Sequence, residues 1–404
     1  MSIFYVIFIL LAAYFSYRYD GIEEHDSHKQ HRLWLMCGYM ICLAGFSYGL
    51  GADKFTYMEE FEYYPKSFAE AREYILSSLL LRGQMPLWTL LNLSCKYFFD
   101  SFYAVQLLES AAINIAVCYI VSKYTHRYFL FLLFYFFSLK YFIFNCEVMR
   151  EGFAIAFVMI GMHGYMNGRR WQFFVLLFIG LMFHVSAAIA FLFPFINLKL
   201  SWKTLFISII LSFVFWIVSD FMMGKVLSMA FGGEGAFAQK ITFYSLQASS
   251  FFGYLRYLLT YLIFPYIVMY YMILNEPSEE MRKRKIKLTS FMLVLAIIAI
   301  SIYPLARFYN YVQIFYLIMF TDFLFTLFRS YEHLIIRIGT SIGTILIMFW
   351  FYFSHYETTD TYYYDFFYPY TCILHEDKSV FFRSIAHEEA VNPQATDKNT
   401  RDIE

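Results

Sequence analysis

Runs of apolar residues long enough to cross a lipid bilayer recur along the whole chain. A helix needs about 20 consecutive apolar residues to span the ~30 Å hydrocarbon core, and several runs approach or exceed that length. Hydrophobic residues make up 60% of the 404 residues and charged residues 15%, whereas soluble domains have roughly 45–50% and 25%. These values exclude a soluble enzyme, a disordered chain, a coiled coil and a nucleic-acid-binding protein. The sequence therefore predicts an all-α polytopic integral membrane protein.

The runs predict about 11–13 transmembrane helices, some of them short or re-entrant. Two shorter pieces, Tyr74–Leu81 and Leu87–Phe99, are expected to be re-entrant or interfacial. The first run lacks a preceding basic residue and is followed by Arg18, so we expect a retained helix and not a cleaved signal peptide. The main runs are Ser2–Tyr17, Leu33–Leu50, Tyr103–Val121, Tyr128–Phe144, Phe153–Met166, Phe173–Ile196, Leu205–Val218, Leu255–Leu274, Leu288–Tyr303, Tyr311–Phe328 and Ile335–Phe353.

Charge is balanced overall, with 31 basic and 31 acidic residues, but its local distribution predicts an orientation. Lys and Arg accumulate in the cytoplasmic loops of membrane proteins. The densest basic cluster lies in Asn275–Lys287, which we therefore expect to be cytoplasmic. This orientation puts residues 221–253 on the outer side and Arg307 near the outer end of its helix.

The run Phe173–Ile196 has basic residues of the cytoplasmic type on both sides. Either Lys199 and Lys203 face outward against the charge rule, or the run folds into a short helical hairpin that turns near His184. We favour the hairpin.

Two outer segments are too long and polar to be simple connections. Their aromatic and glycine content favours structured outer loops over residues 51–86, with Asp53 and Tyr57, and over residues 221–253, with Lys240 and Tyr244. Residues 1–375 are expected to form one transmembrane domain. The polar residues 376–404 are expected to be a disordered tail.

Three arginines lie inside or at the edges of apolar runs, where a charge is costly to bury. Arg150 precedes the run Phe153–Met166, Arg307 lies between two runs, and Arg256 begins another at its outer end. Arginine stays charged and binds phosphate in a bidentate manner, so three arginines around one outer cavity suit an anionic ligand. Snorkelling to the interface or internal ion pairs are the alternative explanation.

His184 is the histidine most deeply embedded in apolar sequence. A neutral imidazole there could donate to a phosphate, orient an acceptor hydroxyl or take its proton, or it could be an ordinary core residue. Asp53, and Glu147 and Glu151 beside Arg150, are candidate general bases or ion-pair partners. The sequence has no metal-binding motif, and its six cysteines lack CxxC spacing, so neither a metal nor a cofactor is predicted.

Several of these residues occur in patterns that resemble the EpsG family of bacterial Wzy-like polysaccharide polymerases. In that family an arginine begins an alanine-containing helix, a basic turn follows, and a phenylalanine–histidine–x–serine–alanine stretch comes next. The corresponding segments here are Cys146-Glu147-Val148-Met149-Arg150-Glu151-Gly152-Phe153-Ala154, Asn167-Gly168-Arg169-Arg170 and Leu181-Met182-Phe183-His184-Val185-Ser186-Ala187-Ala188.

The resemblance extends over roughly residues 1–375. Gly51-Ala52-Asp53 with Tyr57 is similar to the family's entry to the first outer loop, and Arg307 with Tyr311 to the arginine and tyrosine of a late helix. Tyr368-Pro369-Tyr370 is similar to the closing proline–tyrosine. Glu151 departs from the pattern, because a neutral polar residue is expected there, and a salt bridge to Arg150 would weaken Arg150 as a phosphate ligand.

The resemblance implies a GT-C-like arrangement of helices and a metal-independent glycosyl transfer on the outer face of the bacterial inner membrane. The donor would be a growing glycan on undecaprenyl pyrophosphate, and the acceptor a lipid-linked repeat unit. A chain-length regulator and a flippase of the same pathway are the implied partners, beside membrane lipids.

The candidate roles follow from this reaction. Arg150 and Arg307 would bind the pyrophosphate with help from Arg256 and Lys240, and His184 or Asp53 would act on the acceptor hydroxyl. Aromatic side chains would stack on sugar rings or line the lipid path, with Tyr57, Tyr244 and Tyr311 as candidates. An O-antigen ligase or other lipid-linked glycosyltransferase, a membrane-bound O-acyltransferase and a lipid-linked oligosaccharide flippase are the alternatives.

Overall fold

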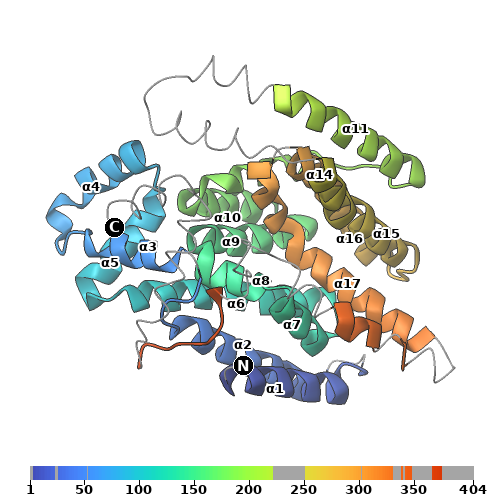
Figure 1. Cartoon of the computed structure of the whole chain (residues 1–404), viewed down its shortest axis with the longest axis horizontal. Helices are drawn as coiled ribbons and strands as arrows, with labels where there is room; N and C mark the ends of the chain where they lie inside the picture. Colours follow the sequence, from blue (N-terminus) through green and yellow to red (C-terminus); the bar gives the residue numbers. More distant parts are fainter. Residues whose placement is uncertain are drawn as a thin grey trace, which may run out of the picture. The chain divides into compact units, whose positions relative to one another are not determined.

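The computed structural model describes residues 3–22, 26–51, 53–221, 251–301, 303–330, 338–339, 342–347 and 366–374. These residues form helices joined by turns and loops, apart from an isolated antiparallel bridge between Ser47 and Cys372 (Figure 1). The chain is thus an all-α polytopic membrane protein, as its apolar runs predict.

Three described helices are long and apolar enough to cross a membrane, namely Phe102–Tyr124, Phe251–Leu274 and Leu305–Phe328. A fourth span is obtained if Tyr128–Phe137 and Lys140–Glu147, which meet at 80°, are counted as one broken helix. Other apolar runs form shorter helices, in line with the expected short or re-entrant segments. The shorter apolar helices include Ile3–Tyr19, Arg170–Phe183 and Trp202–Val218.

The chain divides into two compact units. Unit 1 contains Met1–Leu76, Pro86–Ala156 and Leu324–Glu404, and unit 2 contains Ser77–Met85 and Phe157–Phe323. The chain passes from the first to the second within helix α9 (Met149–Met166) and returns within α17 (Asn310–Ser330).

Unit 1 is built around the packing of α2 on α6 and of α1 on α7. The α2–α6 contact is close at Gly45, where an added Cβ would lie 2.6 Å from the Leu107 side chain. The Gln106 amide donates to the carbonyls of Ala44, at 2.8 Å, and Gly45, at 3.0 Å, so it satisfies the end of α2. The elements of this unit are α1 Ile3–Tyr19, α2 Ser27–Gly45, α3 Lys54–Glu62, η1 Phe68–Glu70, α4 Ala71–Ser77, α5 Pro86–Phe99, α6 Phe102–Tyr124, α7 Tyr128–Phe137, α8 Lys140–Phe142, η3 Ile143–Glu147 and the start of α9.

Residues 366–374, the C-terminal strap, pair with the segment between α2 and α3. The Tyr48 amide donates to the Thr371 carbonyl at 2.9 Å, and the Gly51 amide donates to the Phe366 carbonyl at 2.9 Å. The Tyr5 hydroxyl donates to the Phe367 carbonyl at 2.7 Å. The strap therefore holds both the first helix and the entry to the first outer loop.

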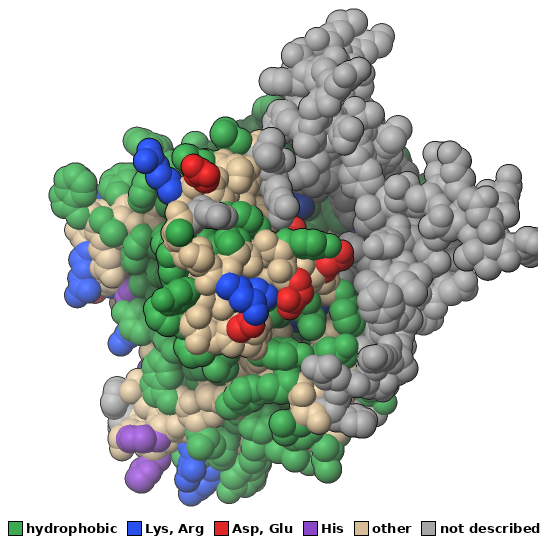
Figure 2. Space-filling model, turned by 90° about the vertical axis from the view of Figure 1, so that its left-hand side faces the viewer, with side chains coloured by type: hydrophobic (Ala, Val, Ile, Leu, Met, Phe, Trp, Pro, Cys, Tyr) green, Lys and Arg blue, Asp and Glu red, His purple; other side chains and the backbone are tan. Residues whose placement is uncertain are grey.

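The segment predicted to be the first outer loop is helical, because α3, η1 and α4 occupy most of residues 54–77. Figure 2 faces the side of the molecule on which Figure 1 draws these helices and α5, and hydrophobic side chains cover much of it around small groups of mixed charge. Lys96 forms ion pairs with Glu62 at 3.0 Å and with Asp100 at 3.2 Å in this part of the chain. Helix α5 is only about 21 Å long, too short to cross a bilayer, which agrees with an interfacial or re-entrant segment.

Unit 2 consists of helices packed around α16, and most of the second outer loop (222–250) lies outside the described residues. The basic cluster forms the first turns of α16 and is not an open loop. The elements are η2 Ser78–Arg82, the rest of α9, α10 Arg170–Phe183, η4 Val185–Leu192, α11 Trp202–Phe221, α14 Phe251–Tyr257, η6 Leu258–Ile263, α15 Phe264–Leu274, α16 Glu279–Ser301, η7 Tyr303–Tyr309 and the start of α17.

The run Phe173–Ile196 forms the predicted hairpin. Helix α10 ends at Phe183, His184 takes an extended conformation, and η4 packs back against α10. At the other end of the hairpin, the Lys287 ammonium donates to the Ile196 carbonyl at 2.6 Å.

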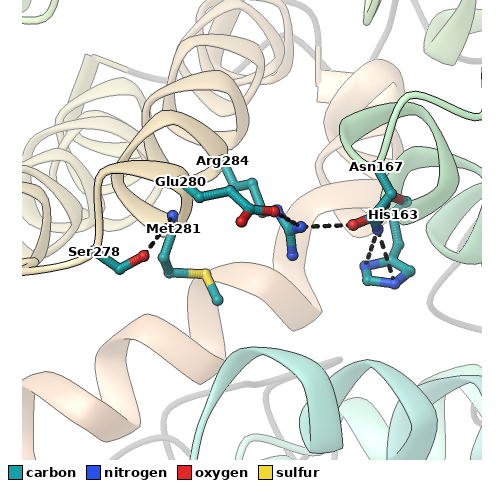
Figure 3. Close-up of polar contacts among 6 residues, drawn as sticks. All are labelled: His163, Asn167, Ser278, Glu280, Met281 and Arg284. Carbon is teal, nitrogen blue, oxygen red and sulfur yellow. Dashed lines mark hydrogen bonds and ion pairs between the residues drawn. The ribbon is translucent and has the colours of Figure 1, made fainter.

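A polar chain ties the start of α10 to the same end of α16. Arg284 donates to the side-chain Oδ1 atom of Asn167 at 2.5 Å and pairs with Glu280, and Asn167 contacts the His163 ring (Figure 3). Both ends of the hairpin therefore lie beside the basic start of α16.

Asp20, just beyond α1, gives the fold a pH-dependent contact. Its carboxylate accepts from the Leu130 amide at 2.8 Å in the first turn of α7, and burial raises the pKa of Asp20 to about 6. Because the pKa of Asp20 is higher in the folded than in the unfolded protein, protonation of Asp20 stabilises the fold. This contribution to the free energy of unfolding is complete below about pH 4 and is lost as the pH rises through 6. We expect Asp20→Asn to flatten the fall in apparent melting temperature between pH 4.5 and 7 in detergent. An unchanged slope would contradict this assignment.

Candidate functional site

Arg150 is the centre of a polar site in unit 1. It is the second residue of α9, and its guanidinium lies 5.4 Å from the centre of the Tyr57 ring of α3. Asp53 and Glu60 lie within electrostatic range. The Nε atom is buried and has no hydrogen-bond partner, whereas the Tyr57 side chain is hydrogen-bonded to the guanidinium. A partly buried guanidinium with an unpaired Nε–H suits an anionic ligand.

The local sequence explains how Arg150 reaches this position. The π-helical turn η3 ends at Glu147, and α9 begins two residues later, so Arg150 lies in the first turn of a new helix. The positive end of the α9 dipole adds to the guanidinium charge. Tyr57 is held from the other side by Trp88, whose ring centre is 5.7 Å from that of Tyr57.

Two buried ionisable side chains, one basic and one acidic, lie near this site. Lys54 and Glu109 are both 0% exposed. The Lys54 ammonium contacts the Met149 sulfur at 3.8 Å, and both carboxylate oxygens of Glu109 lack a hydrogen-bond partner. Burial lowers the pKa of Lys54, and the nearby Cys146 and Glu109 oppose that shift. The pair links α3, α6 and the start of α9, which are the elements that place Tyr57 and Arg150.

Gly152 allows the Glu109 side chain to approach α9. A Cβ at this position would lie 2.5 Å from the Glu109 Oε1 atom and 2.5 Å from the Phe144 carbonyl oxygen. Backbone cannot move as a flexible side chain does, so Gly152→Ala should cost about 1–3 kcal/mol or more of folding free energy. The apparent melting temperature in detergent tests this, with Gly38→Ala as a control because nothing lies within 4 Å of its Cβ position. Equal stability of the two variants would contradict the packing argument.

The acidic residues beside Arg150 in sequence lie near a different basic residue, Lys140. Glu151 is 2% exposed, and both Glu147 and Glu151 lie within electrostatic range of Lys140. A helix turns by about 100° per residue, so neighbours along α9 point in different directions. The groups with the largest electrostatic effect on Arg150 are Tyr57, Glu60 and Asp53, so Asp53 is a nearer candidate base than Glu147 or Glu151.

Unit 2 contains a second polar cluster at the turn of the hairpin. His184 Nδ1 lies 2.5 Å from Ser186 Oγ, and Ser186 Oγ lies 2.8 Å from the Tyr311 hydroxyl. Ser186 and Tyr311 are buried, whereas His184 is partly exposed. The hairpin turn and the first turn of α17 thus meet through Ser186.

Arg256 and Arg307 are exposed residues of the same unit. Arg256 lies on α14 and Arg307 on η7. The turn η6, which directly follows α14, contacts η7 through the Tyr261 and Tyr309 rings, whose centres are 4.9 Å apart. A short connection joins the end of α15 to the basic start of α16. Because α14 precedes α15 and η7 follows α16, both lie at the other end of these two helices, as does His184.

The structure thus groups the predicted residues into two sets. Asp53, Tyr57 and Arg150 lie together in unit 1, whereas His184, Tyr311, Arg256 and Arg307 lie at one end of unit 2. Lys240 and Tyr244 lie outside the described residues.

Sequence reasoning did not select Lys54, Glu109 or Ser186. Glu109 could have been found as a charge inside the apolar run Tyr103–Val121. Within the described residues no group of three or more His, Cys, Asp or Glu side chains is placed to hold a metal ion.

Comparison with known proteins gives one match. The model of the EpsG family matches residues 32–372, a range that contains every candidate residue named above. No curated protein and no solved structure matches the chain. Because the matched range covers most of the sequence, and includes the arginine and histidine motifs, this chain belongs to the EpsG family of Wzy-like polysaccharide polymerases.

Proposed function

We propose that the protein polymerises oligosaccharide repeat units carried on undecaprenyl pyrophosphate. The growing glycan is the donor, and a hydroxyl of an incoming lipid-linked repeat unit is the acceptor. The observation that carries this proposal is Arg150, a partly buried guanidinium at the N-terminus of α9 whose Nε atom has no hydrogen-bond partner. A site of that kind suits the pyrophosphate of the leaving group.

The reaction needs two kinds of group. The acceptor hydroxyl attacks the anomeric carbon, its proton passes to a base, and the bond between that carbon and the pyrophosphate oxygen breaks. Asp53 or His184 acts on the hydroxyl. Arg150 and Arg307, assisted by Arg256 and Lys240, stabilise the charge on the departing pyrophosphate, so the positive charge comes from the protein and no metal ion is required.

The aromatic residues complete the substrate site. Tyr57, Tyr244 and Tyr311 present flat rings of the type that stack on sugars, and Tyr57 lies directly against the guanidinium of Arg150. The lipid chain is held by the apolar helices within the membrane. A flippase that delivers the repeat units and a chain-length regulator are the expected partners in the pathway.

The charge distribution of unit 2 supports an outward-facing reaction. The basic start of α16 and Arg169-Arg170 lie at one end, where Arg284 contacts Asn167. With this end in the cytoplasm, Arg256, Arg307 and His184 face the periplasm of the bacterial inner membrane.

The test uses the native host. A strain deleted for the gene is complemented with the wild-type sequence, and its surface glycan is separated on a gel beside its undecaprenyl-linked intermediates. We expect the deletion to lose the long-chain ladder and to accumulate single lipid-linked units. A ladder that lacks only an acyl group would favour an acyltransferase. Repeat units trapped on the cytoplasmic face would favour a flippase. Polymer that forms but is not transferred to lipid A core would favour a ligase.

A further inference from the structure

The polar cluster at the hairpin turn of unit 2 defines the protonation of His184. The backbone amide of Ser186 donates to His184 Nδ1 at 3.3 Å. A backbone N–H can only donate, so Nδ1 must carry a lone pair and no hydrogen. In a neutral imidazole the hydrogen then resides on Nε2.

The unprotonated Nδ1 atom also determines which hydroxyl group donates in each of the two side-chain hydrogen bonds of the cluster. Because Nδ1 has no hydrogen, the 2.5 Å contact with Ser186 Oγ requires the serine hydroxyl to donate. With its only hydrogen used, Ser186 Oγ accepts from the Tyr311 hydroxyl at 2.8 Å. The chain of hydrogen bonds therefore runs from Tyr311 through Ser186 to His184.

Burial makes this arrangement stable. Ser186 is 5% exposed and Tyr311 1% exposed, so water cannot easily replace either donor. A protonated imidazole would place an N–H against the Ser186 amide and would leave the serine hydroxyl without its acceptor. The neutral ring with hydrogen on Nε2 is the form that satisfies all of these groups.

We infer that His184 serves the reaction as a hydrogen-bond donor through Nε2, with Ser186 and Tyr311 as the positioning residues that fix its tautomer. This inference rests on the proposed function and decides between the roles left open for His184. The ring donates to an oxygen of the lipid-linked substrate and does not remove the proton of the acceptor hydroxyl. That proton then goes to a carboxylate base.

Three substitutions of His184 separate a donor from a base. Glutamine retains an N–H₂ donor near the Nε2 position but cannot act as a base, glutamate has a similar shape but only accepts when ionised, and alanine has neither property. Membranes containing each variant are incubated with lipid-linked intermediates extracted from the deletion strain, and the rate of ladder formation is measured. We expect His184→Gln to remain within about tenfold of wild type, whereas His184→Glu and His184→Ala lose about 10²- to 10³-fold. An active glutamate variant with an inactive glutamine variant would overturn the inference.

The positioning residues are tested by their own variants. Ser186→Ala and Tyr311→Phe each remove one hydrogen bond from the chain, so we expect about a three- to tenfold loss in rate, with recovery in Ser186→Thr. Tyr316→Phe is the matched control, because it removes a buried hydroxyl from the same helix without touching Ser186. Equal effects of Tyr311→Phe and Tyr316→Phe would contradict the positioning role.

A spectroscopic readout keeps the inference separate from the proposed function. In ¹⁵N-histidine-labelled protein, the signals that disappear in His184→Gln should show an unprotonated Nδ1 and a protonated Nε2. The opposite tautomer, or an imidazolium at neutral pH, overturns the inference even if polymer forms. The expected tautomer in a protein that forms no polymer would instead reject the proposed function and leave the geometry of His184 supported.

Discussion

Arg150→Ala is expected to abolish the long-chain glycan and to cause single lipid-linked units to accumulate. Removal of one preorganised donor from a transition-state site costs about 10²- to 10³-fold in rate, and a buried guanidinium that faces a pyrophosphate should be at the upper end. Arg150→Lys keeps the charge but loses the planar, bidentate geometry, so we expect an intermediate rate. Both variants are measured by the ladder assay and by protein level in the membrane.

The matched control for this experiment is Arg282→Ala, which removes an exposed arginine from the basic end of α16. We expect Arg282→Ala to retain the wild-type ladder. A normal ladder from Arg150→Ala, at normal protein level, would remove Arg150 from the site. A ladder lost equally in both variants would indicate a general sensitivity to charge and not a role for this guanidinium.

Lys54→Met is expected to destabilise the protein, because Lys54 opposes the cost of burying the Glu109 carboxyl group, whose oxygens have no hydrogen-bond partner. Removal of one partner from a buried pair typically costs about 3–5 kcal/mol, whereas replacement of both partners by neutral groups is often tolerated. Glu109→Gln should also destabilise, and the double variant should be more stable than the sum of the two single effects predicts.

The measurement for this pair is a double-mutant cycle on the apparent melting temperature in detergent. Non-additivity confirms that Lys54 and Glu109 act as a pair across α3 and α6. Strict additivity would mean that the two side chains are buried independently. Lys96→Met is a useful comparison, since Lys96 is also buried but forms ion pairs with exposed partners, Glu62 and Asp100.

The class of fold follows from the sequence because membrane helices depend on local composition. The apolar runs predict the all-α membrane fold, and the basic residues on both sides of one run favour the hairpin formed by α10 and η4. The bend between α7 and α8 was not predicted, because the run Tyr128–Phe144 contains no proline or glycine, although Ser138 and Lys140 interrupt it at the bend.

The candidate site is less accessible to sequence reasoning because it depends on which face of each helix becomes buried. Asp53 and Lys54 are neighbours, and composition alone favours neither. The first turns of α3 bury Lys54, Tyr57 and Phe61 on one face, so the lysine enters the core and the aspartate remains partly exposed. Ser186 could be named as part of a motif, but its role depends on a contact with Tyr311, 125 residues later in the chain.

The C-terminal strap has a consequence for biosynthesis. The Thr371 hydroxyl donates to the Tyr48 carbonyl at 2.5 Å across 323 residues of sequence, so the entry to the first outer loop remains incomplete until almost the whole chain has left the ribosome. Contacts of such high sequence separation form late and slowly. During translation, the backbone around Tyr48 and Gly51 therefore lacks these hydrogen bonds until residues 366–374 have been synthesised. The machinery that inserts this protein has to tolerate that open intermediate, and the synthesis of residues 366–374 determines when the backbone around Tyr48 and Gly51 gains these contacts.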